Sequence, residues 1–166
     1  GGTLANVLAG IERVHRAGMW LEVLTLVVPG FNDSDAELRR IAGFIADLSP
    51  DIPWHITAFH PDYKMQDRGG TPVSSLLRAV KHGEAAGLHY IYAGNLPGAV
   101  GRYEHTRCPQ CQTVLVERRG FAVQGYHLDG NGCPQCHATI PGRWHTATTL
   151  PHLQHATRAR VTPIRL

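Results

Sequence analysis

Apolar and polar positions along the first 100 residues form three successive pairs, each a helix pattern followed by a strand pattern. The helix patterns cover residues 4–14, 34–48 and 72–86, where apolar residues recur every three or four positions. The strand patterns cover residues 20–28, 54–59 and 89–93 and are short and largely apolar. Strands separated by single helices run parallel, because the crossover helix returns the chain to the same edge of the sheet. The pattern predicts an α/β fold.

The ends of the helices carry recognisable signals. Ser34 and Glu37 form a capping-box pattern at the start of the second helix. Pro72 occupies the predicted first position of the third helix, where its missing N–H has no partner to lose. Gly18 and Gly87 follow the first and third helices, at positions where a helix end favours positive φ. These signals mark where the predicted helices begin and end.

Each predicted strand ends in a loop rich in Pro, Gly and polar residues, over residues 29–33, 60–64 and 94–98. In parallel α/β folds, ligands bind at the carboxyl ends of the strands, because loops from several strands converge there. Three strands do not close a barrel. The sequence therefore predicts part of a ligand-binding α/β domain over residues 1–104, with further strands outside this chain.

Two Cys-Pro-Gln-Cys units follow, Cys108 to Cys111 and Cys133 to Cys136. The two-residue gap in each unit lets both thiolates face one ion, and four sulfurs complete a tetrahedral Zn²⁺ site that leaves no position for a substrate. The intervening residues 113–118 and 121–124 predict a hairpin too small to be stable alone. The spacing predicts a structural zinc ribbon over residues 105–144.

Other chemistry is compatible with the same four cysteines. Disulfides or a redox Cys-x-x-Cys pair are one alternative, although a redox pair does not need a second copy of itself in a small β module. Iron is the other, because four thiolates hold either metal and ligand geometry alone does not separate them. His105 and His137 flank the units and are interpreted as bystanders.

Several motifs resemble a known enzyme family. They are Val27-Val28-Pro29-Gly30, Trp54-His-Ile-Thr-Ala-Phe-His-Pro-Asp-Tyr-Lys64, Gly94-Asn-Leu-Pro-Gly98 and the four-cysteine ribbon. Over residues 1–144 the chain is similar to the radical SAM enzymes of the AmmeMemoRadiSam system, which are related to pyruvate formate-lyase activating enzyme. The resemblance implies the C-terminal half of a partial, TIM-barrel-like (β/α) barrel. It also implies S-adenosylmethionine and a [4Fe-4S] cluster, which together give a 5′-deoxyadenosyl radical in the intact enzyme.

The chain departs from this family in one decisive respect. The family holds its cluster with a Cys-x3-Cys-x2-Cys loop, whereas the four cysteines of this chain all belong to the ribbon. The first residues, Gly1 to Leu4, contain neither an initiator Met nor a signal pattern. We therefore expect the cluster-binding half to lie upstream of Gly1, and this chain alone to be inactive, with no catalytic residue of its own.

The resemblance assigns cofactor-binding roles to residues at the strand ends. His60 would lie beside S-adenosylmethionine, and Val28, Pro29 and Gly30 would line its nucleoside. From the residues alone, a loop histidine bonded to nearby backbone is the simpler interpretation of His60. Asn95 suits left-handed geometry and either points into the cleft mouth or closes a turn.

Charge and composition narrow the remaining classes. The net charge is +3, and Arg118-Arg119 is the one basic pair between the cysteine units, so a nucleic-acid partner is disfavoured. Residues 145–166 form a basic stretch without apolar periodicity, which predicts a disordered tail. No apolar run reaches the roughly 18 residues that suggest a membrane span, so we expect a cytoplasmic protein.

Two function classes remain. The first is the C-terminal part of a radical S-adenosylmethionine enzyme, acting on an unknown substrate that could be a protein. The second is a zinc-ribbon recognition module on a non-catalytic α/β scaffold. A hydrolase would need a metal cluster or a nucleophile with its base in the strand-end loops, and none is apparent in the sequence.

Overall fold

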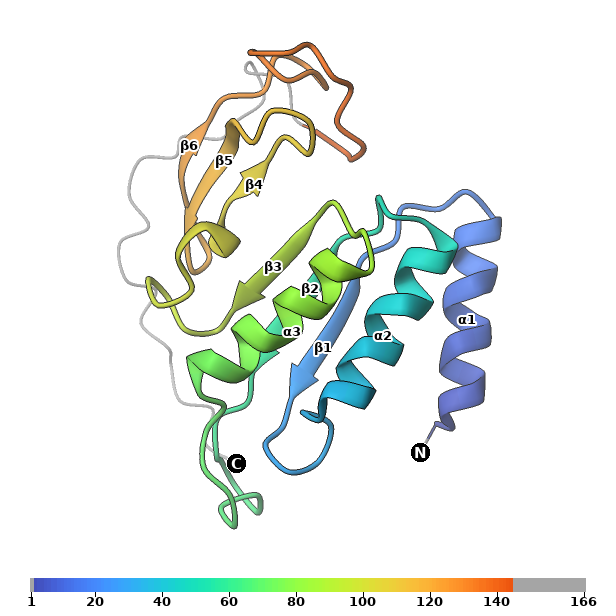
Figure 1. Ribbon diagram of the computed structural model, residues 1–166, viewed down its shortest axis with the longest axis vertical. Helices are drawn as coiled ribbons and strands as arrows, with labels where there is room; N and C mark the ends of the chain where they lie inside the picture. Colours follow the sequence, from blue (N-terminus) through green and yellow to red (C-terminus); the bar gives the residue numbers. More distant parts are fainter. Residues whose placement is uncertain (1, 145–166) are drawn as a thin grey trace, which may run out of the picture.

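The computed structural model describes residues 2–144, which form two three-stranded sheets, β1-β2-β3 and β4-β5-β6 (Figure 1). The elements in chain order are α1 (Leu4–Arg16), β1 (Val23–Val27), α2 (Asp35–Leu48), β2 (Trp54–Ala58), α3 (Val73–Ala85), β3 (Ile91–Gly94), the 3₁₀ turn η1 (Gly101–Glu104), β4 (Thr106–Arg107), β5 (Val114–Arg119) and β6 (Ala122–Tyr126). The predicted tail, residues 145–166, lies outside the described residues.

The first sheet is parallel, as predicted. Val23 pairs with Trp54, and Trp54 in turn pairs with Ile91, so the three strands start level with one another. Within residues 2–144 the sheet does not close on itself. The α/β class is therefore confirmed, and the barrel remains an expectation.

The helix caps agree with the sequence signals, whereas some element ends differ by up to three residues. The Ser34 hydroxyl accepts a hydrogen bond from the Glu37 N–H at 3.3 Å. Pro72 precedes α3 as its cap and is not the first helical residue, so that placement was wrong by one position. The predicted first strand began at Trp20, but the ladder begins at Val23, whose N–H donates to the Pro53 carbonyl at 2.9 Å.

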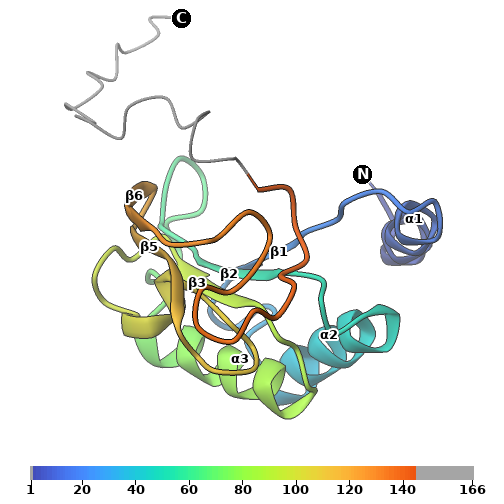
Figure 2. The ribbon, with the colours of Figure 1, turned by 90° about the horizontal axis from the view of Figure 1, so that it is seen from above.

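Helices α2 and α3 cover one face of the parallel sheet, as Figure 2 shows. Trp54 and Ile56 of β2 point to this face and are fully buried, together with Leu38 of α2 and Leu76 of α3. Because side chains alternate along a strand, the neighbouring His55 points to the opposite face and is only partly buried. The core therefore lies between the sheet and these two helices.

Helix α1 contributes little to this core. It stands apart from the sheet and from α2 and α3 in Figure 2, and none of its residues is buried. Leu4 and Val7 on its apolar face remain 70% and 52% exposed. The packed unit of the α/β part consists of the sheet, α2 and α3.

The second sheet is the predicted ribbon, and it packs directly against the first. Residues 113–118 and 121–124 were predicted as a hairpin, and β5 and β6 form it, with the short β4 added on the other side of β5. The Tyr92 hydroxyl on β3 lies 2.9 Å from the Thr106 hydroxyl on β4. Tyr90, just before β3, is buried in the core of the ribbon with Leu115 and Ile140. The two sheets therefore share side chains across their boundary.

None of the helices described in residues 2–144 is both long and apolar enough to cross a membrane.

Candidate metal centre

Two loops with the same backbone geometry carry the four cysteines. The N–H groups of Cys108 and Cys133 each donate to the carbonyl five positions later, on Thr113 and Ala138, both at 2.9 Å. The residue after the second cysteine of each unit has positive φ, 62° at Gln112 and 60° at His137. The sequence repeat thus folds as a structural repeat that turns two thiols of each loop to the same side.

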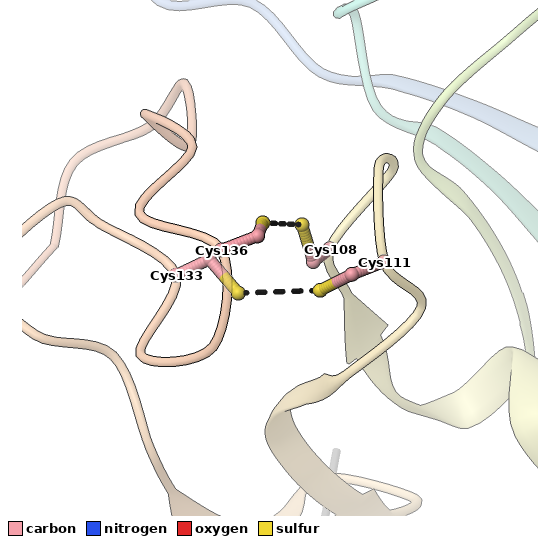
Figure 3. Close-up of side chains that lie close together, drawn as sticks. All are labelled: Cys108, Cys111, Cys133 and Cys136. Atoms are coloured by element: carbon pink, nitrogen blue, oxygen red, sulfur yellow. Dashed lines mark hydrogen bonds between the residues drawn. The ribbon is translucent and has the colours of Figure 1, made fainter.

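The four sulfur atoms converge on one point (Figure 3). Sγ of Cys108 lies 3.5 Å from Sγ of Cys136, and Sγ of Cys111 lies 3.5 Å from Sγ of Cys133. All four Sγ atoms lie within 4.8 Å of one another, and all four residues are free cysteines. A tetrahedral ion with Zn–S bonds of about 2.3 Å places its sulfurs about 3.8 Å apart. The cluster can therefore hold a metal ion such as zinc.

The environment of the thiols favours a bound cation. A hydrogen bond with the Thr113 hydroxyl lowers the pKa of Cys111 to about 6. At Cys136 the Ala138 N–H lowers the pKa, but burial and hydrogen bonds to the other cysteines outweigh it and raise the pKa to about 12. Thiolates this close repel one another, and a bound cation would compensate their charge.

Burial separates a protected side of the site from an open one. Cys108 and Cys133 are 0% and 1% exposed and pack against Leu115, Ile140 and Tyr90, whereas Cys111 is exposed. With four sulfurs around one point, a bound ion keeps no open position for a substrate. The site suits a structural role.

Neither flanking histidine belongs to the cysteine cluster, as predicted for bystanders. Nδ1 of His105 accepts the backbone N–H of Arg118 at 3.1 Å, which fixes η1 to β5. His137 occupies the left-handed position of the second loop, where its backbone N–H donates to the Cys133 carbonyl at 2.9 Å. Both residues therefore have structural roles.

The predicted cofactor-binding residues all follow carboxyl ends of the parallel strands: Val28, Pro29 and Gly30 follow β1, His60 follows β2 and Asn95 follows β3. Figure 1 shows the loops after β1 and β2 at one end of the sheet and the cysteine loops of the ribbon toward the other. The topology thus places the predicted cofactor-binding residues at the carboxyl ends of the parallel strands, away from the metal centre.

The contacts within this edge are mostly internal. The N–H groups of Val28 and Gly30 donate to the side chains of Asn32 and Asp33, at 2.7 and 2.8 Å. These backbone groups are therefore not free donors. Val28 is buried, so a ligand could reach mainly the half-buried Pro29 and the exposed Gly30, whose φ is +69°.

His60 and Asn95 also bond to nearby backbone. Nδ1 of His60 lies 2.8 Å from the Pro61 carbonyl, and its other ring nitrogen has no hydrogen-bond partner within residues 2–144. Asn95 has a φ of +65°, the left-handed geometry that was predicted, and its amide donates to the Ala58 carbonyl at 2.8 Å. Asn95 therefore ties the end of β3 to the end of β2, and it also borders the cavity between the sheet and the ribbon.

Sequence reasoning missed a second polar group. It lies on the open face of the parallel sheet, which is the face that α2 and α3 do not cover. Nε2 of His55 lies 2.7 Å from the Glu22 carboxylate, and the His55 ring stacks on Tyr92 with 4.9 Å between centroids. The sequence pattern that could have identified this group is the alternation of apolar and polar residues in β2. His55 and Thr57 occupy every second position of the strand, so they share one face.

The fold and the site define this chain as a parallel α/β unit joined to a four-cysteine β ribbon. No family model matches it, and no solved structure matches it either. The chain is 40% identical over 128 residues to the uncharacterized protein MJ0808 of Methanocaldococcus jannaschii, a match that covers 76% of this chain. The same match covers 38% of the relative, so the chain corresponds to a minor part of that protein's length.

Proposed function

We propose that the four cysteines hold one structural zinc ion. The observation that supports this is the convergence of all four Sγ atoms within 4.8 Å from two loops of equal geometry. Iron fits the same thiolates, and elemental analysis distinguishes the two metals. Zinc is favoured because a closed four-sulfur site in a small β ribbon serves folding and needs no redox change.

We further propose that the chain is the C-terminal part of a radical S-adenosylmethionine enzyme with an unknown substrate. Support comes from the parallel sheet, whose carboxyl edge collects the Val-Pro-Gly, Phe-His-Pro and Gly-Asn-Leu-Pro-Gly loops, together with the ribbon that follows it. The longer length of the archaeal relative is compatible with a larger protein that contains a similar segment.

The residues of this chain do not fit the [4Fe-4S] cluster. The sequence has four cysteines, and all four Sγ atoms belong to the closed metal site. Cluster binding and reductive cleavage are therefore assigned to a part of the protein outside this chain. The contribution proposed for this chain is to line S-adenosylmethionine with the loop of Val28, Pro29 and Gly30, in which Val28 is buried and Gly30 is exposed. The ring nitrogen of His60 that has no partner within residues 2–144 would serve as a hydrogen-bonding group.

The test compares this 166-residue chain with a longer protein that contains it. Both are reconstituted anaerobically with iron and sulfide, reduced with dithionite, and assayed for 5′-deoxyadenosine from S-adenosylmethionine. We expect product from the longer protein and none above background from this chain. Product from this chain would show that its cysteines are misassigned. Absence of both product and S-adenosylmethionine binding in the reconstituted longer protein would refute the enzyme proposal and favour a non-catalytic ribbon module.

A further inference from the structure

A large cavity lies between the open face of the parallel sheet and the ribbon. Its volume is about 860 Å³, which is within the range of about 300–1,000 Å³ typical of small-molecule sites. Five aromatic residues contribute to its walls: Trp20, Tyr90, Tyr92, Phe121 and Trp144. They come from the approach to β1, from β3, from the β5–β6 turn and from the end of the ribbon. Neither sheet could form this cavity without the other.

The acidic groups of the cavity are already engaged by the protein. The two Glu22 oxygens accept from Trp20 Nε1 at 2.9 Å and contact His55 Nε2 at 2.7 Å. The two Glu104 oxygens accept the backbone N–H groups of Gly98 and Gly120. Each carboxylate oxygen thus has a partner within the fold, so neither acid is an evident partner for a cationic ligand.

The basic groups of the cavity retain free donors. Within residues 2–144, Arg118 donates from Nη1 to the Thr106 hydroxyl at 2.7 Å and also interacts with the Tyr92 side chain, whose ring centroid lies 5.6 Å from the guanidinium. A guanidinium has five N–H donors, so most of those on Arg118 remain available. Arg143 is exposed and has no hydrogen bond or ion pair within residues 2–144. The cavity lining thus carries two carboxylates, whose oxygens already have partners, and two guanidinium groups with donors left for a ligand.

His55 also lines the cavity. Because Nε2 of His55 is engaged by Glu22, Nδ1 is the ring nitrogen without a partner among the described residues. A carboxylate on one ring nitrogen orients the imidazole and leaves the other as a hydrogen-bonding group. The His55 ring and the Arg118 guanidinium both lie close to the Tyr92 ring.

We propose that this cavity binds a planar aromatic molecule that carries an anionic group. The aromatic walls contact its ring, Arg118 and Arg143 bind its anion, and His55 Nδ1 forms a hydrogen bond with it. Small-molecule pockets are lined mainly by hydrophobic and aromatic side chains, and a few charged or polar groups fix the orientation of the ligand. This site is separate from the metal centre and does not depend on the proposed reaction of S-adenosylmethionine.

Two fluorescent probes test the proposal on the zinc-loaded 166-residue chain. 8-Anilinonaphthalene-1-sulfonate supplies both a planar ring system and an anion, and N-phenyl-1-naphthylamine has the same rings without the sulfonate. We expect the sulfonate to bind at least tenfold more tightly than the neutral probe, because each charge-assisted hydrogen bond favours the anion. Equal affinities would overturn the assignment of an anion site.

Matched variants locate the anion. Arg118→Gln should weaken binding of the sulfonate by about tenfold or more and leave the neutral probe within about twofold. Arg119→Gln removes the same charge from the next residue of β5, which does not line the cavity, and should change neither affinity. Equal losses in the two variants would refute the proposal, since they would indicate only a general effect of charge.

A second variant protects the test against misfolding. Arg118 bonds to the buried Thr106, so zinc content and the thermal midpoint of Arg118→Gln are measured first. Arg143 has no partner within the described part of the chain, so Arg143→Gln should keep the fold. This variant should still lower the affinity for the sulfonate probe by about threefold, as expected for an exposed charge. The proposal would be overturned if folded Arg143→Gln protein binds the sulfonate with unchanged affinity and Arg118→Gln gives no loss of its own. Arg118→Gln gives no such loss if it binds normally or if it does not fold.

Discussion

Replacing a buried and an exposed cysteine of the metal centre should have the same effect on metal binding and different effects on the metal-free ribbon. Cys133 is 1% exposed and packs in the ribbon core, whereas Cys111 is exposed. Serine at either position removes one thiolate of four. If binding of structural zinc contributes about 10–16 kcal/mol, a quarter of it is about 2.5–4 kcal/mol, or roughly 60-fold to 700-fold in affinity.

The two variants should then differ in stability. Serine at position 133 places a hydroxyl among Leu115, Ile140 and Tyr90, and an unsatisfied buried hydroxyl costs about 1–3 kcal/mol. Serine at position 111 is exposed and still faces the Thr113 hydroxyl, so it should add little to this cost. The metal-free Cys133→Ser ribbon should therefore be the less stable of the two.

Elemental analysis and competition with a chromophoric chelator measure the metal. We expect about one zinc per chain in the unmodified protein, with residues 106–144 losing hydrogen-exchange protection when the metal is removed. Gln110→Ser is the control, because it alters an exposed residue between two ligands without removing a thiolate. Less than about half an equivalent of zinc or iron in protein purified without chelator, with the ribbon still protected, would refute the metal site. Equal metal-free stabilities of the two serine variants would refute the role assigned to burial.

Two further predictions concern the core and the strand-end loops. Gly83→Ala should lower the free energy of unfolding by about 1–3 kcal/mol, because the added Cβ would lie 2.8 Å from Ile91 Cδ1 and 3.1 Å from the Trp54 ring. Gly43→Ala lies in α2, and its added Cβ would meet nothing within 4 Å, so this variant should raise the free energy of unfolding by about 0.5–1 kcal/mol. Urea unfolding measures both variants. Midpoints that shift in the same direction would contradict the expected contrast. In the longer protein, His60→Ala should lower the affinity for S-adenosylmethionine by about tenfold to a hundredfold, measured by calorimetry, while zinc stays bound. Unchanged affinity would leave His60 as a loop residue bonded to the Pro61 carbonyl.

The sequence by itself determined the features that depend on local spacing. Helical and strand periodicity predicted α1, α2, α3 and the three parallel strands, because each pattern reflects burial of one side of a single element. Ser34 and Asn95 showed the predicted local geometry, since a cap or a left-handed turn involves neighbours only a few residues away. The cysteine spacing predicted the metal centre for the same reason.

Strand ends and the short strand β4 could not be predicted with the same accuracy. The first strand starts at Val23 because its register partner is Trp54, the first residue of β2, and that register depends on a segment 31 positions away (54 − 23). Thr106 and Arg107 carry no strand pattern of their own and pair only because β5 lies beside them. Such strand ends depend on how neighbouring strands pair. The periodicity of a single strand carries no information about its partner.

Only the tertiary structure decided which polar side chains meet. Glu22, His55, Tyr92 and Arg118 lie in four separate segments, and the parallel register places His55 beside Tyr92 while the docked ribbon brings Arg118 over the same ring. Each of these residues looks in sequence like an ordinary polar position at a strand. Their grouping depends on strand register and on the packing of the ribbon against β3, and both are properties of the assembled fold.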